Sequence, residues 1–427
     1  MDRPLLRPIA TAAIVALLAA ACGSPTPSVS PSATASPQPS SSAPSVSPGA
    51  SGSGGDAAVY AEINAQVRAI RGLEEKQPVE PTIVSPDEMT QVLKDSFSED
   101  YPPEQVAADE QLYHGLGLLP KEDKLADLYI DLLSSQVAGL YDPIKKKLYV
   151  VSKEGGIGAV EKVYYSHEYD HVLQDQNFDL KKMQDGLEDK TDEALARQSL
   201  VEGDAYLTMS YWLQQHLTPA EVGEVIQASN DPAAQQALNR IPPIVQAQIT
   251  FSAIQGTQFV TGVQLSGGWD AVNSGFADPP QSTEQILHPE KYTAREKPIA
   301  VDLPADLAKR MGSGWSTVMS DTMGEHQTSI WLGAGSVAAA TDAAAGWGGD
   351  RITYLSGPND SWAIAWHTVW DSKSDAAEFD VTAKTAVEKA GGPGQVLPGE
   401  GGTTRWVVIG SDDAALQKVA NVLGLAG

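Results

Sequence analysis

The segment from residue 24 to residue 55 limits what this chain can fold into more than any other part of the sequence. It consists almost entirely of Ser, Pro, Ala, Gly and Thr, and it contains no charged and no aromatic residue. Such a chain cannot bury enough apolar surface to offset the conformational entropy lost on folding, so we expect it to stay disordered. A folded body must therefore begin after it, from about residue 57, and the segment itself is typical of a stalk.

The residues before the stalk are typical of an export signal. A short basic region precedes an apolar run that ends at Ala21 and is too short to span a bilayer, which indicates a signal peptide over residues 1–21. Cys22, the only cysteine, follows small residues and precedes a glycine. This arrangement resembles the cleavage and lipidation motif of bacterial lipoproteins. We therefore expect an exported cell-envelope lipoprotein with residues 22–56 as a lipid-anchored linker; ordinary secretion is the alternative.

The charge balance excludes some partners. The chain has 55 Asp and Glu residues against 29 Lys and Arg residues, which gives a formal net charge of −26. An excess of this size repels nucleic acid and anionic membrane surfaces. We expect no nucleic-acid partner, and we expect contact with a membrane only through the lipid anchor on Cys22.

The periodicity of the folded body predicts an α+β protein. Apolar spacing in the region 57–300 is mainly helical, as in 86–97 and 122–137. Two β-prone runs, Leu140–Tyr141 and Leu148–Val151, flank an Asp-Pro turn signal and predict a small β-hairpin.

After residue 300 the pattern changes. Apolar and polar residues alternate in the segment 362–370, which predicts a strand with Trp362, Ile364, Trp366 and Trp370 on one face. We expect residues 301–427 to form a small α+β region with an antiparallel sheet.

Residues 167–171 read HEYDH on a segment of helical periodicity. Both histidines fall on the face where apolar residues recur from Ala159 onward. Four residues along a helix place the two rings ~40° apart and one turn above each other, so both can reach one zinc ion. Glu168 would flank the metal, where a general base is needed. The alternative is three polar residues on a solvated helix.

Glu202 is the candidate for the third ligand. It lies in a predicted helix that begins at Thr191, the expected N-cap, and Asp192 in the first turn suits the helix dipole. A carboxylate within an apolar face is costly unless it is paired or bound to metal. The alternative for Glu202 is a buried ion pair, for instance with Arg197. Asp204 cannot share the orientation of Glu202, but it could accept a hydrogen bond from a ligand histidine.

A His-Glu-x-x-His helix followed by a glutamate on a second helix resembles the gluzincin, or thermolysin-like, metallopeptidases. A closer resemblance, over roughly residues 85–300, is to a group of bacterial secreted or lipoprotein zincins with four ordered motifs. The motifs stand here as LYDPIKKKLYVV at 140–151, HEYDHVLQDQNFDL at 167–180, LVEGDA at 200–205 and STEQILHPEKY at 282–292. The chain departs from the usual pattern at Tyr169 and Asp170, which replace more apolar or small residues.

The resemblance implies a zincin-like metallopeptidase domain over residues 57–300 that binds one zinc ion and cleaves a peptide or protein substrate. The implied zinc ligands are His167, His171 and Glu202, and the implied general base is Glu168. A strand beside the metal helix pairs with the substrate in this family, and Leu148–Val151 is the expected strand. Candidates for stabilising the oxyanion are Tyr206, His288 and Tyr292.

Two functions from different classes remain open at this point. The first is a zinc-dependent peptidase that acts outside the cytoplasm. The second is a catalytically inactive zincin-like surface protein that binds a partner. The presence of every group that the chemistry requires favours the first.

Overall fold

The computed structural model describes residues 53–136, 139–151, 157–230, 240–333 and 337–425, together with positions 232 and 236. The signal peptide, Cys22 and most of the predicted linker lie outside the described residues. The first helix, α1 (Ser53–Arg71), starts inside the predicted linker and ahead of the predicted boundary at residue 57. Within the described part of the chain, no helix is both long and apolar enough to cross a membrane.

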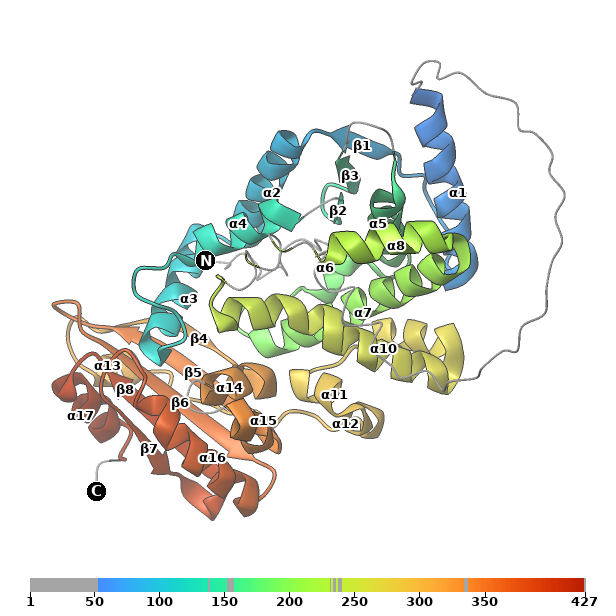
Figure 1. Ribbon diagram of the computed structural model, residues 1–427. Coiled ribbons are helices and arrows are strands. Elements are labelled where there is room, and N and C mark those ends of the chain that lie inside the picture. The colour runs from blue at the N-terminus through green and yellow to red at the C-terminus, as the bar shows by residue number, and fades with distance from the viewer. Residues whose placement is uncertain are drawn as a thin grey trace, which may run out of the picture.

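The helical part of the molecule precedes the larger sheet in the chain and carries the predicted site (Figure 1). After α1 its helices are α2 (Pro86–Asp100), α3 (Pro103–Leu116), α4 (Leu125–Gln136), α5 (Ala159–Phe178), α6 (Leu180–Met183), α7 (Thr191–His216), α8 (Pro219–Ser229), α10 (Pro243–Ala277), α11 (Thr283–Leu287) and α12 (Pro289–Ala294); α13 (Leu307–Arg310) follows in the C-terminal region. Local sequence explains where α2 and α8 begin, because Ser85 and Thr218 each form a capping box ahead of a proline.

Thr191 is not the N-cap of α7, so that prediction is wrong. Lys190 occupies the cap position, and the backbone N–H of Thr191 donates to Asp321 at 2.8 Å. Asp192 is buried, where it accepts a hydrogen bond from the N–H of Thr283 at 3.1 Å. The start of α7 is therefore fixed by tertiary contacts, which local sequence does not reveal.

A small three-stranded sheet lies against the helical part. Its order is β1 (Pro81–Val84), β3 (Lys147–Val151), β2 (Gly139–Asp142), with β1 parallel and β2 antiparallel to β3. The β2–β3 hairpin confirms the prediction, whereas β1 is too short to give a periodic signal. Because β3 is central and paired on both sides, the prediction that it pairs with a substrate is wrong.

The C-terminal region forms a five-stranded antiparallel sheet, which confirms an α+β protein. Its strands are β4 (Ser316–Asp321), β5 (Trp347–Ser356), β6 (Trp362–Trp370), β7 (Gly394–Pro398) and β8 (Thr404–Gly410), in the order β4-β5-β6-β8-β7. The alternation in β6 is confirmed, since Ile364 and Trp366 pack into one core while Ala363 and Ala365 face another. The sequence does not predict the two edge strands, β4 and β7.

Helices cover both faces of this sheet (Figure 1). Residues of α14 (Gly324–Gly333), α15 (Val337–Ala344) and α16 (Lys373–Val387) join the core on the face of Trp366. Residues of α13 and α17 (Asp413–Val422) pack on the other face. A short 3-10 helix, Glu400–Gly402, precedes β8.

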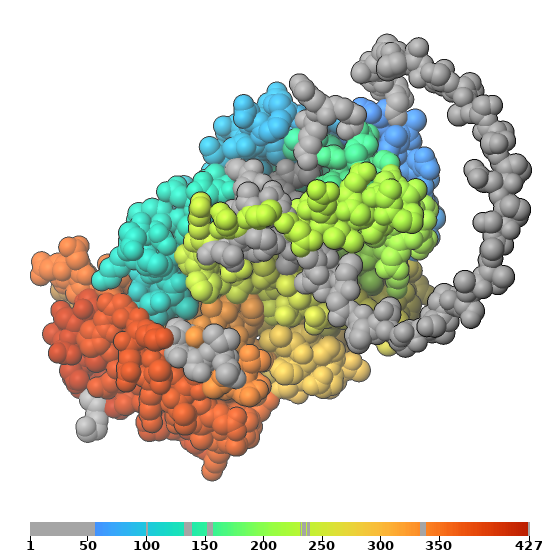
Figure 2. Space-filling view, in the orientation of Figure 1, coloured from blue at the N-terminus to red at the C-terminus, as the bar shows by residue number. Residues whose placement is uncertain are grey.

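The sheet shares its larger core with helices from the N-terminal part of the chain. Leu112 and Leu116 of α3 and Tyr129 of α4 belong to the same cluster as Trp366. Figure 2 shows this segment, coloured cyan, lying directly against the orange and red C-terminal part. The approach is close, because a Cβ atom added at Gly115 would lie 2.7 Å from Ile364 Cδ1. The C-terminal region is therefore packed into the molecule and not appended to it.

Two glycines let α7 and α10 approach closely. A Cβ atom at Gly203 would lie 2.2 Å from the carbonyl oxygen of Gly256, and one at Gly256 would lie 2.2 Å from that of Ser199. A larger residue at either position would push the helices apart. Because Gly203 directly follows Glu202, this contact also sets the position of a predicted ligand.

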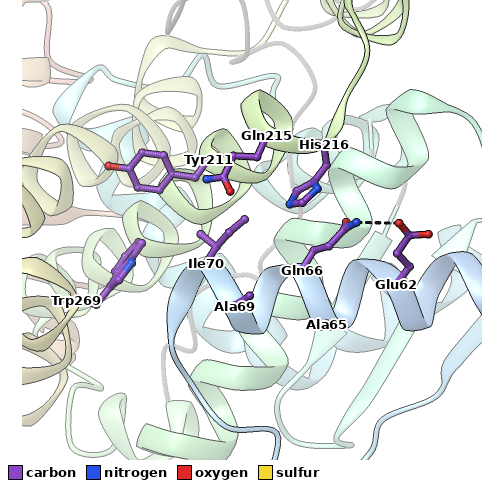
Figure 3. Close-up of a pocket in the computed structure, with 9 residues that line it drawn as sticks. All are labelled: Glu62, Ala65, Gln66, Ala69, Ile70, Tyr211, Gln215, His216 and Trp269. Carbon is purple, nitrogen blue, oxygen red and sulfur yellow. Dashed lines mark hydrogen bonds between the residues drawn. The ribbon is translucent and has the colours of Figure 1, made fainter.

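A groove of about 600 Å³ lies between α1, α7 and α10 (Figure 3). Aromatic and polar side chains line it, among them Tyr211, His216 and Trp269. None of the three predicted metal ligands is among its lining residues, so the groove is separate from the predicted metal site.

Candidate metal centre

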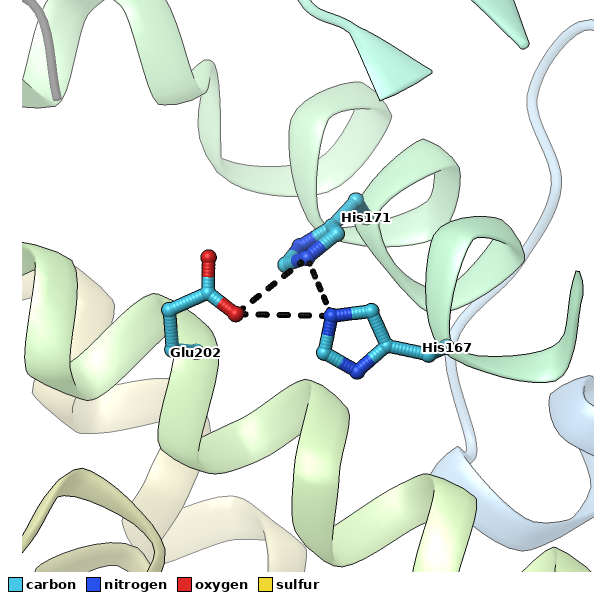
Figure 4. Close-up of side chains that lie close together, drawn as sticks. All are labelled: His167, His171 and Glu202. Carbon is cyan, nitrogen blue, oxygen red and sulfur yellow. Dashed lines mark hydrogen bonds and ion pairs between the residues drawn. The ribbon is translucent and has the colours of Figure 1, made fainter. Parts of the chain in front are cut away.

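Helices α5 and α7 bring His167, His171 and Glu202 together. His167 and His171 lie one turn apart on α5, and their Nε2 atoms are 3.1 Å apart. Glu202 on α7 points at both rings, with its Oε2 3.4 Å from His167 Nε2 and 3.8 Å from His171 Nε2 (Figure 4). These three atoms could hold a metal ion.

Burial sets the ionisation of this cluster. Both rings are fully buried, and this lowers the pKa of His167 to about 3 and that of His171 to about 4. The carboxylate of Glu202 opposes the shift at His171. At neutral pH both imidazoles are therefore neutral and have a lone pair to offer, which is the form that binds a metal. Burial also raises the pKa of Glu202, against the opposing effects of His171 and Gln198.

The contacts of Glu202 exclude the ion pair considered above. Arg197 bonds instead to the side chain of Glu193 and to the carbonyl of Met183. Glu202 Oε1 accepts a hydrogen bond from the amide of Gln198 at 2.8 Å, which leaves Oε2 directed at the histidines.

Glu168 lies on the same helix as the histidines and faces the small sheet. The backbone N–H of Tyr141 in β2 donates to Glu168 Oε2 at 2.8 Å. Gly139, also in β2, is so close that a Cβ atom there would lie 3.0 Å from Glu168 Cγ. The edge strand β2 therefore orients the carboxylate that follows the first histidine.

Asp204 reaches the site through another side chain. Its Oδ2 accepts a hydrogen bond from Gln174 Nε2 at 3.0 Å, and Gln174 Oε1 lies 2.8 Å from His171 Nδ1. Its Oδ1 accepts a bond from Arg71 Nε at 2.7 Å. Sequence reasoning missed Gln174 and Arg71. The position of Gln174, one turn after His171 on the same helix, is a signal that could have found it, whereas Arg71 gives no such signal.

Of the three oxyanion candidates, Tyr206 lies against the cluster, with its ring centroid 4.5 Å from that of His167. His288 Nε2 instead lies 2.9 Å from Glu325 Oε1 on α14. The hydroxyl of Tyr292 donates to the carbonyl of Asp278 at 2.9 Å.

The motif that contains His288 joins the helical part to the C-terminal region. Lys291 Nζ lies 2.6 Å from Glu284 Oε1, 2.9 Å from Glu296 Oε1 and 2.6 Å from Asp371 Oδ2. These three acids form the second group whose geometry could hold a metal ion. The ammonium group of Lys291 already supplies a cation there, so we interpret this cluster as a structural ion-pair network that connects the two parts of the molecule.

Fold and site together define a helix-rich α+β protein with a buried His-His-Glu cluster that could bind a metal ion. Residues 310–420 match the family described as a domain of unknown function, DUF8575, and they contain the whole five-stranded sheet. No curated protein matches the chain. No solved structure matches it.

Proposed function

We propose that this protein is a zinc-dependent peptidase of the zincin type that hydrolyses peptide bonds outside the cytoplasm. The observation that carries the proposal is the convergence of two histidines and a glutamate at one buried point. Glu168, the residue that follows the first histidine on α5, is a second buried glutamate. Two imidazole nitrogens and one carboxylate oxygen form the protein ligand set of one class of catalytic zinc site, which keeps a fourth position open.

The spacing of the three atoms supports zinc as the metal. Ligands ~2.0–2.1 Å from a tetrahedral zinc ion lie about 3.3 Å from one another. The observed separations of 3.1, 3.4 and 3.8 Å bracket that value. Neutral imidazoles beside a carboxylate also form an acceptor-rich cluster, which a cation would stabilise.

Glu168 is the general base in this proposal. Its carboxylate takes a proton from the attacking water and delivers it to the leaving amine nitrogen as the carbon–nitrogen bond breaks. A bound zinc ion supplies polarisation of the scissile carbonyl and a lowered pKa of water. The N–H of Tyr141 orients Glu168, and Tyr206 is the candidate donor to the oxyanion because it lies beside His167. We propose the edge strand β2, in place of β3, as the strand that pairs with the substrate.

Metal analysis and a hydrolysis assay test the proposal. The purified whole chain should contain about one zinc per molecule and should cleave members of a peptide library. A chelator should abolish cleavage, and added zinc should restore it. Protein that holds zinc but cleaves no peptide would favour the inactive binding protein, and protein that binds no zinc would contradict both.

We also propose that a lipid on Cys22 tethers the protein to the cell envelope. The short apolar run and the single cysteine, followed by the stalk, motivate this proposal. Cys22→Ala should move the protein out of the membrane fraction or leave it unprocessed, as judged by fractionation and the size of the product. Unchanged processing and membrane association would contradict the proposal.

A further inference from the structure

Gln174 connects His171 to a buried polar network behind the metal cluster. Its Oε1 lies 2.8 Å from His171 Nδ1. Its Nε2 lies 3.0 Å from the carbonyl oxygen of Val201, 3.0 Å from Asp204 Oδ2 and 3.1 Å from Asp170 Oδ2. Gln174 itself is fully buried, so no solvent competes for these bonds.

The surroundings of Gln174 allow one orientation of its amide. The carbonyl of Val201 can only accept a hydrogen bond, whatever the ionisation of the two carboxyl groups. A flipped amide would place Oε1 against that carbonyl and against two carboxyl oxygens, while Nε2 would face His171. The Nε2 group must therefore face Val201, Asp204 and Asp170, and Oε1 must face His171.

This orientation decides which nitrogen of His171 carries the proton. An amide oxygen is an acceptor, so Nδ1 of His171 must be the donor. The neutral ring then has its lone pair on Nε2, the atom that faces His167 and Glu202. His167 has no equivalent partner among the described residues, because its buried Nδ1 lacks a hydrogen bond there.

The network is held in turn by the last residue of α1. Arg71 and Asp204 are both fully buried, and Arg71 Nε donates to Asp204 Oδ1 at 2.7 Å. The guanidinium also lies 4.6 Å from the ring centroid of Trp269 in α10. A buried, charge-assisted hydrogen bond has a well-defined geometry, so Arg71 fixes the carboxylate that orients Gln174.

We propose that Gln174 is a positioning residue that keeps the lone pair of His171 Nε2 directed at the metal cluster, and that the Arg71–Asp204 pair holds Gln174 in place. The effect that this proposal predicts on zinc affinity rests on the proposed function. The effect that it predicts on the tautomer of His171 can be measured on metal-free protein and does not depend on enzymatic activity.

Nitrogen-15 NMR of the metal-free whole chain tests the tautomer. The chain has only seven histidines, and the His171 signals can be assigned by comparison with His171→Ala. We expect the wild-type ring to carry its proton on Nδ1. We expect Gln174→Met, which keeps the length but removes the acceptor, to show a mixture of both tautomers. A wild-type ring protonated on Nε2 would overturn the proposal, and this measurement requires no variant of Gln174.

Zinc affinity, measured by competition with a chelating dye, tests the consequence. Removal of a partner that orients a ligand typically weakens metal binding about 10–100-fold. We therefore expect zinc affinity to fall by that factor in Gln174→Met and by a comparable factor in Arg71→Met. Gln214→Met near the end of α7 is the matched control, because Gln214 is exposed and lies outside this network, and it should bind zinc like the wild type. Unchanged zinc affinity with an unchanged tautomer in Gln174→Met would overturn the proposal, whether or not the protein cleaves peptides.

Discussion

Glu168 and Glu202 are both buried glutamates within one site, yet their substitution should affect zinc binding and peptide hydrolysis differently. Glu168→Gln keeps the size of the side chain and an oxygen that can accept the hydrogen bond from the N–H of Tyr141. It should retain zinc, but its rate of peptide hydrolysis should fall by about 10²–10⁴-fold, because only the base is removed. Glu202→Ala removes a ligand and should lose both zinc and hydrolysis.

Metal content and peptide cleavage, measured on the same preparations, check this pair of expectations. Glu193→Ala is the matched control, because Glu193 lies on the same helix but pairs with Arg197 away from the cluster. It should leave both readouts unchanged. If Glu168→Gln cleaves peptides like the wild type, or Glu202→Ala binds zinc as tightly, the assignment of the site is wrong.

A second prediction at this scale concerns Asp109, which should make stability depend on pH. Burial raises the pKa of Asp109 to about 7 in the folded protein, although the hydroxyl of Tyr101 donates to it and opposes the shift. The folded state therefore binds this proton more tightly than the unfolded state, whose pKa is near the ordinary ~3.9. The contribution of this group to stability is present at low pH and is lost as pH rises through about 7.

Thermal melts at pH 5 and pH 8 check the prediction for Asp109. Asp109→Asn cannot ionise, so it should gain stability relative to the wild type at pH 8 and much less at pH 5. Asp131→Asn, on the exposed side of α4, is the control and should show a similar difference at both values. An equal effect of Asp109→Asn at the two pH values would contradict the assignment of the proton to Asp109.

At the residue scale, much of the candidate cluster could be predicted because its members are spaced by the geometry of a helix. His167 and His171 lie four residues apart, and Glu202 is a charge within an apolar face. The partners that complete the site come from distant parts of the chain. Tyr141 acts through its backbone N–H and Arg71 comes from the end of α1, and neither role leaves a local pattern.

Among the elements, the pair α7 and α10 positions Glu202 through two glycines. A Cβ atom at Gly203 or Gly256 would lie 2.2 Å from a backbone oxygen of the other helix. Gly203→Ala and Gly256→Ala should each cost about 1–3 kcal/mol of stability through overpacking. They should also weaken zinc binding, because separation of the helices moves Glu202 away from the histidines.

Gly223→Ala in α8 is the matched control for these two substitutions. Gly223 lies in a helix, and nothing is within 4 Å of a Cβ atom added there. Alanine should therefore stabilise this helix by up to about 1 kcal/mol. Denaturant unfolding and zinc titration of the three variants check the set; an unperturbed Gly203→Ala variant would show that the close approach does not set the site.

The elements that the sequence predicts are those with a periodic apolar face, such as α5, α7 and β6. The missed strands β1, β4 and β7 are short, and all three lie at sheet edges, where less of each strand is buried. The error over β3 has a different origin. A hairpin pattern shows that two strands pair, but it does not show which of them receives a third strand on its other side.

On the scale of the whole molecule, the C-terminal region completes structure that begins near residue 97. The largest core cluster combines Leu112 and Leu116 of α3 with Trp331 and Trp366 of the C-terminal region. Polar contacts cross the same boundary, since Asp321 accepts a hydrogen bond from Thr191. The match to a domain family over residues 310–420 marks a recurring sequence unit, but in this chain that unit shares its core with other helices.

A chain that ends at residue 300 should therefore not fold into a soluble protein. Loss of the C-terminal region would expose the apolar face of α3 and α4, which costs about 1.5–3 kcal/mol of stability for each large side chain. The exposed apolar patch would favour aggregation. The truncation would also remove Glu325 and Asp371, the C-terminal partners of His288 and Lys291. Soluble yield, binding of a hydrophobic dye and zinc content should all report the loss.

Deletion of residues 24–52 is the control for this truncation. It removes none of the described structure, so soluble yield, dye binding and zinc content should all stay as in the whole chain. A soluble fragment ending at residue 300 that binds zinc and cleaves peptides like the whole chain would show instead that the C-terminal region is an independent module.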